Sequence, residues 1–139
     1  MTRTGVVELQ FPAQARYLVL ARLGLAGVAQ AAELDAETLM DLKLAITEAC
    51  SNAVRHAYQD ERGGDVFVRI ELLADRLAVQ VTDHGHGFEP SGVGEWQAAA
   101  LREQGMGLSI IRSVTDELEV ASTVDGAGTT VRFARSLDP

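Results

Sequence analysis

Hydrophobic and polar positions follow the chain in two periods, one typical of strands and one typical of helices. Residues 6–11 alternate with period two, which predicts a first strand that ends at Pro12. Residues 14–32 have apolar side chains at helical spacing, and a second helix is predicted to follow an N-cap at Asp35 and to run to about Tyr58. The first part of the chain is therefore predicted to be a strand followed by two helices.

The second part of the chain predicts two strand pairs with a helix between them. Residues 65–73 and 76–82 are strand patterns joined by a tight turn, which is typical of a hairpin. Residues 118–122 and 129–134 predict a further pair, and a helix is predicted over 108–115. Strands joined by hairpins with grouped helices favour an α+β fold. We expect two layers, with a mixed, mostly antiparallel sheet and the helices on one face.

A long glycine-rich segment connects the first strand pair to the third helix. It spans residues 83–107, and a short helix is predicted within it at 98–103. Loops of this length in a compact domain are usually functional. We therefore expect a lid at about 88–104, within a single domain over residues 1–139.

Composition and charge narrow the classes of function. The chain has 139 residues, 47% of them hydrophobic, and a net charge of −8, which argues against nucleic acid because a phosphate backbone needs a basic face. Cys50 is the only cysteine in the sequence, so it has no intramolecular disulfide partner. The longest apolar stretch, 17–32, is interrupted by Arg22 and Gln30 and is too short to span a membrane. We expect a cytoplasmic protein.

Lysine usage excludes two familiar ways of binding a nucleotide. The sequence has one lysine, Lys43, within a helical pattern. The phosphate-binding loop ends in Gly-Lys-Ser/Thr, and eukaryotic-type protein kinases need a lysine on a strand. Nucleotide binding by this chain would need a different device.

Three polar residues of the second predicted helix share one face. Glu48, Asn52 and His56 are spaced i, i+4 and i+8. Such residues are usually only solvated, but small and apolar neighbours place Asn52 near the core boundary, where a polar group needs a partner. The Asn52 side-chain oxygen suits Mg²⁺, and a carboxylate one turn away can orient or deprotonate an attacking hydroxyl.

A second group of candidates follows the strand that ends near Thr82. Asp83 can accept a hydrogen bond from the exocyclic amine of adenine, and the Gly85 and Gly87 backbones let a flat group approach closely. An ordinary Asp-Gly turn is the alternative interpretation. The two intervening histidines have too few soft ligands elsewhere in the sequence to predict zinc.

The start of the third helix offers a phosphate site that needs no lysine. Gly105, Met106, Gly107 and Leu108 open this helix, and backbone N–H groups at a helix N-terminus bind phosphate well. A flexible hinge is the alternative for a lone Gly-x-Gly. Residues 128–130 (Gly-Thr-Thr) enter the last strand, where threonine is common, and say little alone.

Together and in this order, the four motifs resemble those of a known ATPase superfamily. Residues 47–58 resemble the N-box of the ATPases that include gyrase B, histidine kinases and MutL. Residues 83–87 and 105–108 are similar to the two glycine boxes, and 128–130 to the closing element. Within this superfamily the chain resembles, over about residues 5–135, the anti-sigma-factor serine kinases of the RsbW and SpoIIAB type.

This resemblance implies a Bergerat-type sandwich that binds ATP and Mg²⁺. Members phosphorylate a serine on a small anti-anti-sigma partner of the STAS type, and they sequester a sigma factor, often as homodimers. The resemblance assigns these roles to matching residues: Glu48 as general base, Asn52 on the metal, Asp83 on adenine with Thr130 nearby, Gly85 and Gly87 lining the adenine pocket, and Gly105, Met106, Gly107 and Leu108 on the phosphates.

Two other functions stay open on the sequence. The chain could be a non-catalytic module that binds ATP and a partner, or an ATPase subunit in which hydrolysis drives a conformational change. Glu48 favours catalysis over the first, and the small size disfavours the second. We also expect the lid to become ordered over bound nucleotide, a change that Trp96 would report.

Overall fold

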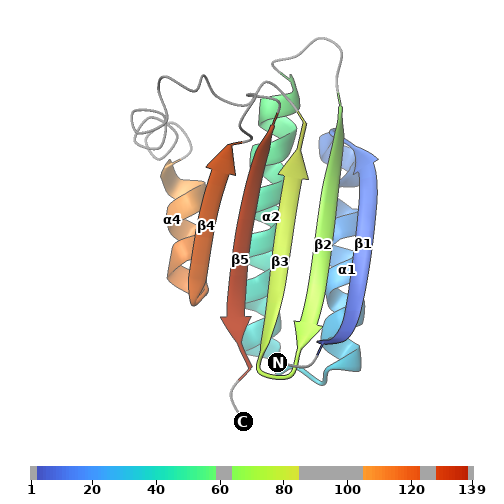
Figure 1. Ribbon diagram of the computed structural model, residues 1–139, viewed down its shortest axis with the longest axis vertical. Helices are drawn as coiled ribbons and strands as arrows, with labels where there is room; N and C mark the ends of the chain where they lie inside the picture. The colour runs from blue at the N-terminus through green and yellow to red at the C-terminus, as the bar shows by residue number, and fades with distance from the viewer. Residues whose placement is uncertain (1–2, 59–63, 85–104, 123–127, 138–139) are drawn as a thin grey trace.

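The computed structural model describes residues 3–58, 64–84, 105–122 and 128–137 (Figure 1). In these ranges the predicted strands and helices are all present. In chain order the described elements are β1 (Arg3–Pro12), the 3-10 helix η1 (Ala15–Tyr17), α1 (Leu18–Ala31), α2 (Ala36–Tyr58), β2 (Asp65–Leu73), β3 (Arg76–Asp83), α4 (Gly105–Val114), β4 (Glu117–Ser122) and β5 (Thr129–Ser136).

The strands form one sheet in the order β1-β2-β3-β5-β4, with the helices on one face (Figure 1). This confirms the expected two-layer α+β architecture. Each of the four described strand pairings is antiparallel, where a mixed but mostly antiparallel sheet was expected. The α1–α2 connection accounts for the first of these pairings, because the two helices together return the chain to the end of the sheet where β1 finishes (Figure 1).

Alternation along the central strands separates a buried face from a polar one. Side chains at every second position of β2, β3 and β5 pack against α1 and α2 in a continuous core. Largely inaccessible members of that core are Leu25, Leu42, Ile46, Val66, Val68, Ile70, Leu77, Val79, Val81, Ile111 and Phe133.

The opposite face of the sheet carries a row of polar side chains. The strand registers place five of them side by side across the sheet, and Arg69 Nη1 donates to Glu8 Oε1 at 3.0 Å. The row consists of Glu8, Arg69, Gln80, Arg132 and Glu119. In the described structure, this face is covered by no helix (Figure 1).

The helix boundaries follow local chemistry. The Thr38 N–H donates to Asp35 Oδ1 at 2.7 Å, which confirms the predicted N-cap of α2 and holds the pKa of Asp35 below its usual value. The helix predicted over 108–115 begins earlier than its apolar pattern indicated, at Gly105, the first residue of the glycine motif that was expected to open it. Glycine is unfavourable in a helix interior, so the apolar pattern assigned the first turn of α4 to the preceding loop. The helix predicted at 98–103 lies outside the described residues.

The described helices include none that is both long and apolar enough to cross a membrane.

Candidate functional site

The four motifs are carried to one end of the molecule by different elements. The C-terminal part of α2, the end of β3, the N-terminal end of α4 and the start of β5 all lie at this end (Figure 1). The residues there form two groups. In one group, side chains of α2 lie against α4; in the other, the end of β3 lies against the start of β5.

The first group brings Glu48 and Asn52 of α2 against the first turn of α4. A Cβ atom placed on Gly107 would lie 3.1 Å from Glu48 Oε2 and 3.5 Å from Asn52 Oδ1. The contact to the carboxylate is tighter than most Cβ contacts, so a Cβ atom at 107 would require the Glu48 side chain to shift, while its distance to Asn52 is an ordinary contact. The carboxylate and the amide therefore lie beside the backbone at the start of a helix, where N–H groups are available to an anion.

Asn52 is buried although its side chain is polar. It is 2% exposed, and its Oδ1 accepts a hydrogen bond from Arg55 Nη2. Its Nδ2 has no hydrogen-bond partner among the described residues. A buried donor without a partner is costly unless something else pairs with it, so this amide is suited to a ligand oxygen.

The second group joins the end of β3 to the start of β5. Asp83 and Thr129 are register partners, and each is 2% exposed. A Cβ atom on Gly128 would lie 2.1 Å from the Asp83 carbonyl oxygen, so only glycine fits this crossing of the two backbones. The Thr129 hydroxyl is buried and has no hydrogen-bond partner in the described parts of the chain.

The structure does not bring Thr130 to this group. The Thr130 hydroxyl lies 3.2 Å from the Thr82 hydroxyl, so these two side chains occupy the polar face of the sheet. Thr129 lies on the helix-covered face with Asp83, and sequence reasoning missed it. Strand alternation could have found it, because Val131 and Phe133 are apolar and Thr129 shares their parity.

Several predicted site residues lie outside the part of the chain that the structure describes. Gly85, Gly87, the lid and Trp96 lie outside the described residues, and the His56 side chain is likewise not described. His84 packs edge-on against Phe67, with ring centroids 5.0 Å apart. Within the described ranges no cluster of three His, Cys, Asp or Glu side chains could hold a metal.

Cys50 lies on the buried face of α2, between Glu48 and Asn52 in the sequence. Burial raises the pKa of its thiol to about 12. The thiol is therefore protonated near neutral pH and is not a nucleophile in the folded protein.

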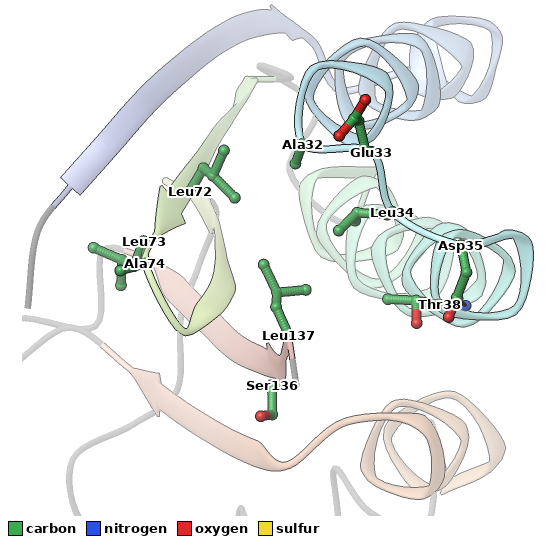
Figure 2. A pocket seen from close by; sticks show the side chains of 10 residues that line it. All are labelled: Ala32, Glu33, Leu34, Asp35, Thr38, Leu72, Leu73, Ala74, Ser136 and Leu137. Carbon is green, nitrogen blue, oxygen red and sulfur yellow. Dashed lines mark hydrogen bonds between the residues drawn. The ribbon is translucent and has the colours of Figure 1, made fainter. Parts of the chain in front are cut away.

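A hollow of about 460 Å³ lies at the opposite end of the molecule, where the α1–α2 and β2–β3 turns meet (Figure 2). Leu34, Leu72 and Leu137 line it, and Glu33 and Asp35 lie at its rim (Figure 2). It contains none of the motif residues, so it is separate from the candidate site.

Comparison with known proteins agrees with the geometry. Residues 11–135 match the family model of the histidine kinase-like ATPase domain. Serine-protein kinase RsbW of Bacillus velezensis is 36% identical, over 99% of this chain and 89% of that protein. Its Bacillus subtilis counterpart is 34% identical, over 95% of this chain and 86% of that protein.

Solved structures show the same fold. The structure of the RsbU and RsbW domains of a Mycobacterium tuberculosis protein superimposes with a TM-score of 0.68 at 20% identity, and covers 98% of this chain and 34% of that one. A histidine kinase domain from Erythrobacter litoralis gives a TM-score of 0.59 at 23% identity, over 91% of this chain and 62% of that one. The chain belongs to the histidine kinase-like ATPase family, among the relatives of the RsbW serine-protein kinases.

Proposed function

We propose that this protein is an ATP-dependent protein-serine kinase that also acts as an anti-sigma-type switch. Its substrate would be a serine of an anti-anti-sigma partner of the STAS type, and it would sequester a sigma factor. The observation that carries the proposal is the convergence of Glu48 and Asn52 on Gly107 at the start of α4. Family membership supports the reaction class.

The α2 residues suit the metal and the proton transfer of such a reaction. An amide oxygen and a carboxylate are the hard oxygen ligands that Mg²⁺ accepts, so Asn52 would hold the ion, which supplies charge neutralisation on the phosphates. Its ligand atom would be Oδ1, which accepts from Arg55 in this structure, so Arg55 would release that oxygen when the ion binds. Glu48 would accept the proton of the attacking serine hydroxyl. The serine oxygen then forms a bond to the γ-phosphorus, the bond from that phosphorus to the bridging oxygen breaks, and ADP leaves.

The remaining residues would bind the nucleotide. Backbone N–H groups of Gly105, Met106, Gly107 and Leu108 would hold the phosphates at the start of α4. The Asp83 carboxylate would accept a hydrogen bond from the exocyclic amine of adenine, and Gly85 and Gly87 would line the adenine pocket. We propose Thr129 rather than Thr130 as the threonine beside adenine, because its buried hydroxyl lies on the Asp83 side of the sheet.

The test separates binding from chemistry on one helix. Asn52→Ala should weaken Mg-ATP binding itself, measured by calorimetry. Glu48→Gln should bind Mg-ATP within a few-fold of wild type and lose about 10²- to 10⁴-fold in phosphate transfer. Transfer is followed in single turnovers from γ-labelled ATP to anti-anti-sigma proteins of the STAS type.

A matched control is Glu37→Gln, which makes the same chemical change in the first turn of α2, far from Gly107. It should leave both binding and transfer unchanged. Transfer by Glu48→Gln at the wild-type rate would disprove the base assignment. Tight ATP binding by wild type without transfer to any such partner would favour the non-catalytic binding module instead.

A further inference from the structure

One side chain of β5, Arg135, forms hydrogen bonds both to the C-terminal end of α4 and to α2. Arg135 Nη1 donates to the Val114 carbonyl at 2.8 Å, at the last residue of α4. The same nitrogen donates to Asp41 Oδ2 of α2 at 2.5 Å. A single guanidinium therefore joins β5, α4 and α2.

This contact is suited to fix an orientation. The Arg135 and Asp41 side chains are 22% and 27% exposed, so solvent competes less for them than for surface pairs. A cation at the last carbonyl of a helix also interacts favourably with the helix dipole. Within the described parts of the chain, two further side-chain hydrogen bonds at the end of α4 are local: Ser113 donates to the Ile110 carbonyl and Thr115 to the Ile111 carbonyl.

The two ends of α4 are thereby attached to the same helix. Gly107 contacts Glu48 of α2 at one end, and Val114 is linked to Asp41 of α2 through Arg135 at the other. Both pairs of positions are seven residues apart, which is about 10 Å along a helix axis. α4 must therefore run antiparallel to α2, held at two points.

We propose that Arg135, together with Asp41, is a positioning residue for the phosphate-binding turn of α4. A ten-residue helix has little intrinsic stability, so its direction depends on its tertiary contacts. Loss of the distal attachment lets α4 turn about its buried side, and the N–H groups of Gly105–Leu108 move away from the phosphates. This inference rests on the proposed function, because it concerns binding of the triphosphate.

We predict that loss of Arg135 weakens binding of a ligand that carries phosphates but not of one that lacks them. In the full-length chain, Arg135→Gln should weaken Mg-ATP binding by on the order of tenfold, while adenosine binding, which does not use the α4 N–H groups, stays within about twofold. Calorimetry with both ligands measures the ratio. A merely structural role for Arg135 would lower both affinities together and would overturn the proposal.

Four further variants sharpen the test. Arg135→Lys keeps a cation at the helix end and should recover part of the ATP affinity. Asp41→Asn should weaken ATP binding in the same direction, and the double variant Asp41→Asn/Arg135→Gln should be no worse than Arg135→Gln, because both act through one contact. Arg132→Gln is the matched control on the polar face of β5 and should change neither affinity.

The outcomes distinguish this inference from the proposed function. If wild type binds ATP and Arg135→Gln binds it equally well, the positioning role is wrong while the function stands. If wild type fails to bind ATP, the proposed function is wrong and the inference falls with it.

Discussion

Glu33, two residues after the end of α1, has a backbone conformation that favours glycine. Its φ is 55°, the one positive value among the described non-glycine residues. The Leu34 N–H donates to the Ala29 carbonyl at 3.0 Å and the Glu33 N–H to the Gln30 carbonyl at 3.2 Å, which is the Schellman pattern. A residue with a Cβ is disfavoured here, because the left-handed conformation brings that atom close to the following carbonyl oxygen.

We therefore predict that Glu33→Gly stabilises the protein by about 1 kcal/mol. Urea unfolding measures the change in midpoint and free energy. Glu37→Gly makes the same replacement in the first turn of α2, where the backbone is helical, and should destabilise by a similar amount. If both variants shift stability in the same direction, the conformational argument fails.

At the scale of elements, the two glycines of α1 differ in what surrounds them. A Cβ atom on Gly27 would meet nothing within 4 Å, and this position is exposed. A Cβ atom on Gly24 would lie 3.0 Å from Leu9 Cδ1, because α1 lies closely on β1 there. Alanine is better than glycine in a helix interior by about 1 kcal/mol, provided that the methyl group has room.

Gly27→Ala is therefore predicted to stabilise the protein by about 0.5–1 kcal/mol, measured by thermal or urea unfolding. Gly24→Ala has the same propensity gain, but the Leu9 side chain must move to accept the methyl group. Its stabilisation should be smaller than that of Gly27→Ala. An equal gain at both positions would show that the contact with β1 imposes no cost.

Most elements could be predicted from the sequence because burial imposes a period on them. The β2–β3 hairpin and the end of α2 at Tyr58 agree with the pattern, and β3 is longer than predicted by a single residue, Asp83. The apolar pattern alone placed the start of α4 at 108, three residues late, because glycines oppose a helix locally. The glycine motif gave the observed start, and its glycines are tolerated where Gly107 lies against Glu48. The role assigned to Thr130 stays a prediction, but strand alternation places Thr129, and not Thr130, on the face of β5 that Val131 shares.

At the scale of the whole molecule, the candidate site depends on contacts between distant parts of the chain. The order of the motifs predicted which residues to consider. The approach of Gly107 to Glu48, and of Gly128 to the Asp83 carbonyl, follows only from the packing of α4 and β5. Arg135 belongs to none of the four motifs, so the sequence could not predict that it links α4 to α2.

Cys50 allows ligand binding and global stability to be measured together. Its side chain is 0% exposed, and burial raises the pKa of its thiol to about 12, so the thiolate fraction near neutral pH is roughly 10³-fold below that of an ordinary cysteine. Alkylation must therefore pass through an opening of the core around α2. In the native protein, the labelling rate reports the population of that open state when reclosing is fast.

A ligand that binds the folded state lowers this population by mass action. With Mg-ATP at 100 times its dissociation constant, we predict that labelling of Cys50 slows by about 100-fold, equivalent to about 2.7 kcal/mol. Mass spectrometry of the alkylated chain measures the rate. Asn52→Ala should show less protection at the same ATP concentration, and GTP should protect little if Asp83 selects adenine. If ATP binds tightly but leaves labelling unchanged, Cys50 becomes accessible by a local opening that does not disturb the nucleotide site, and α2 does not couple the site to the stability of the core.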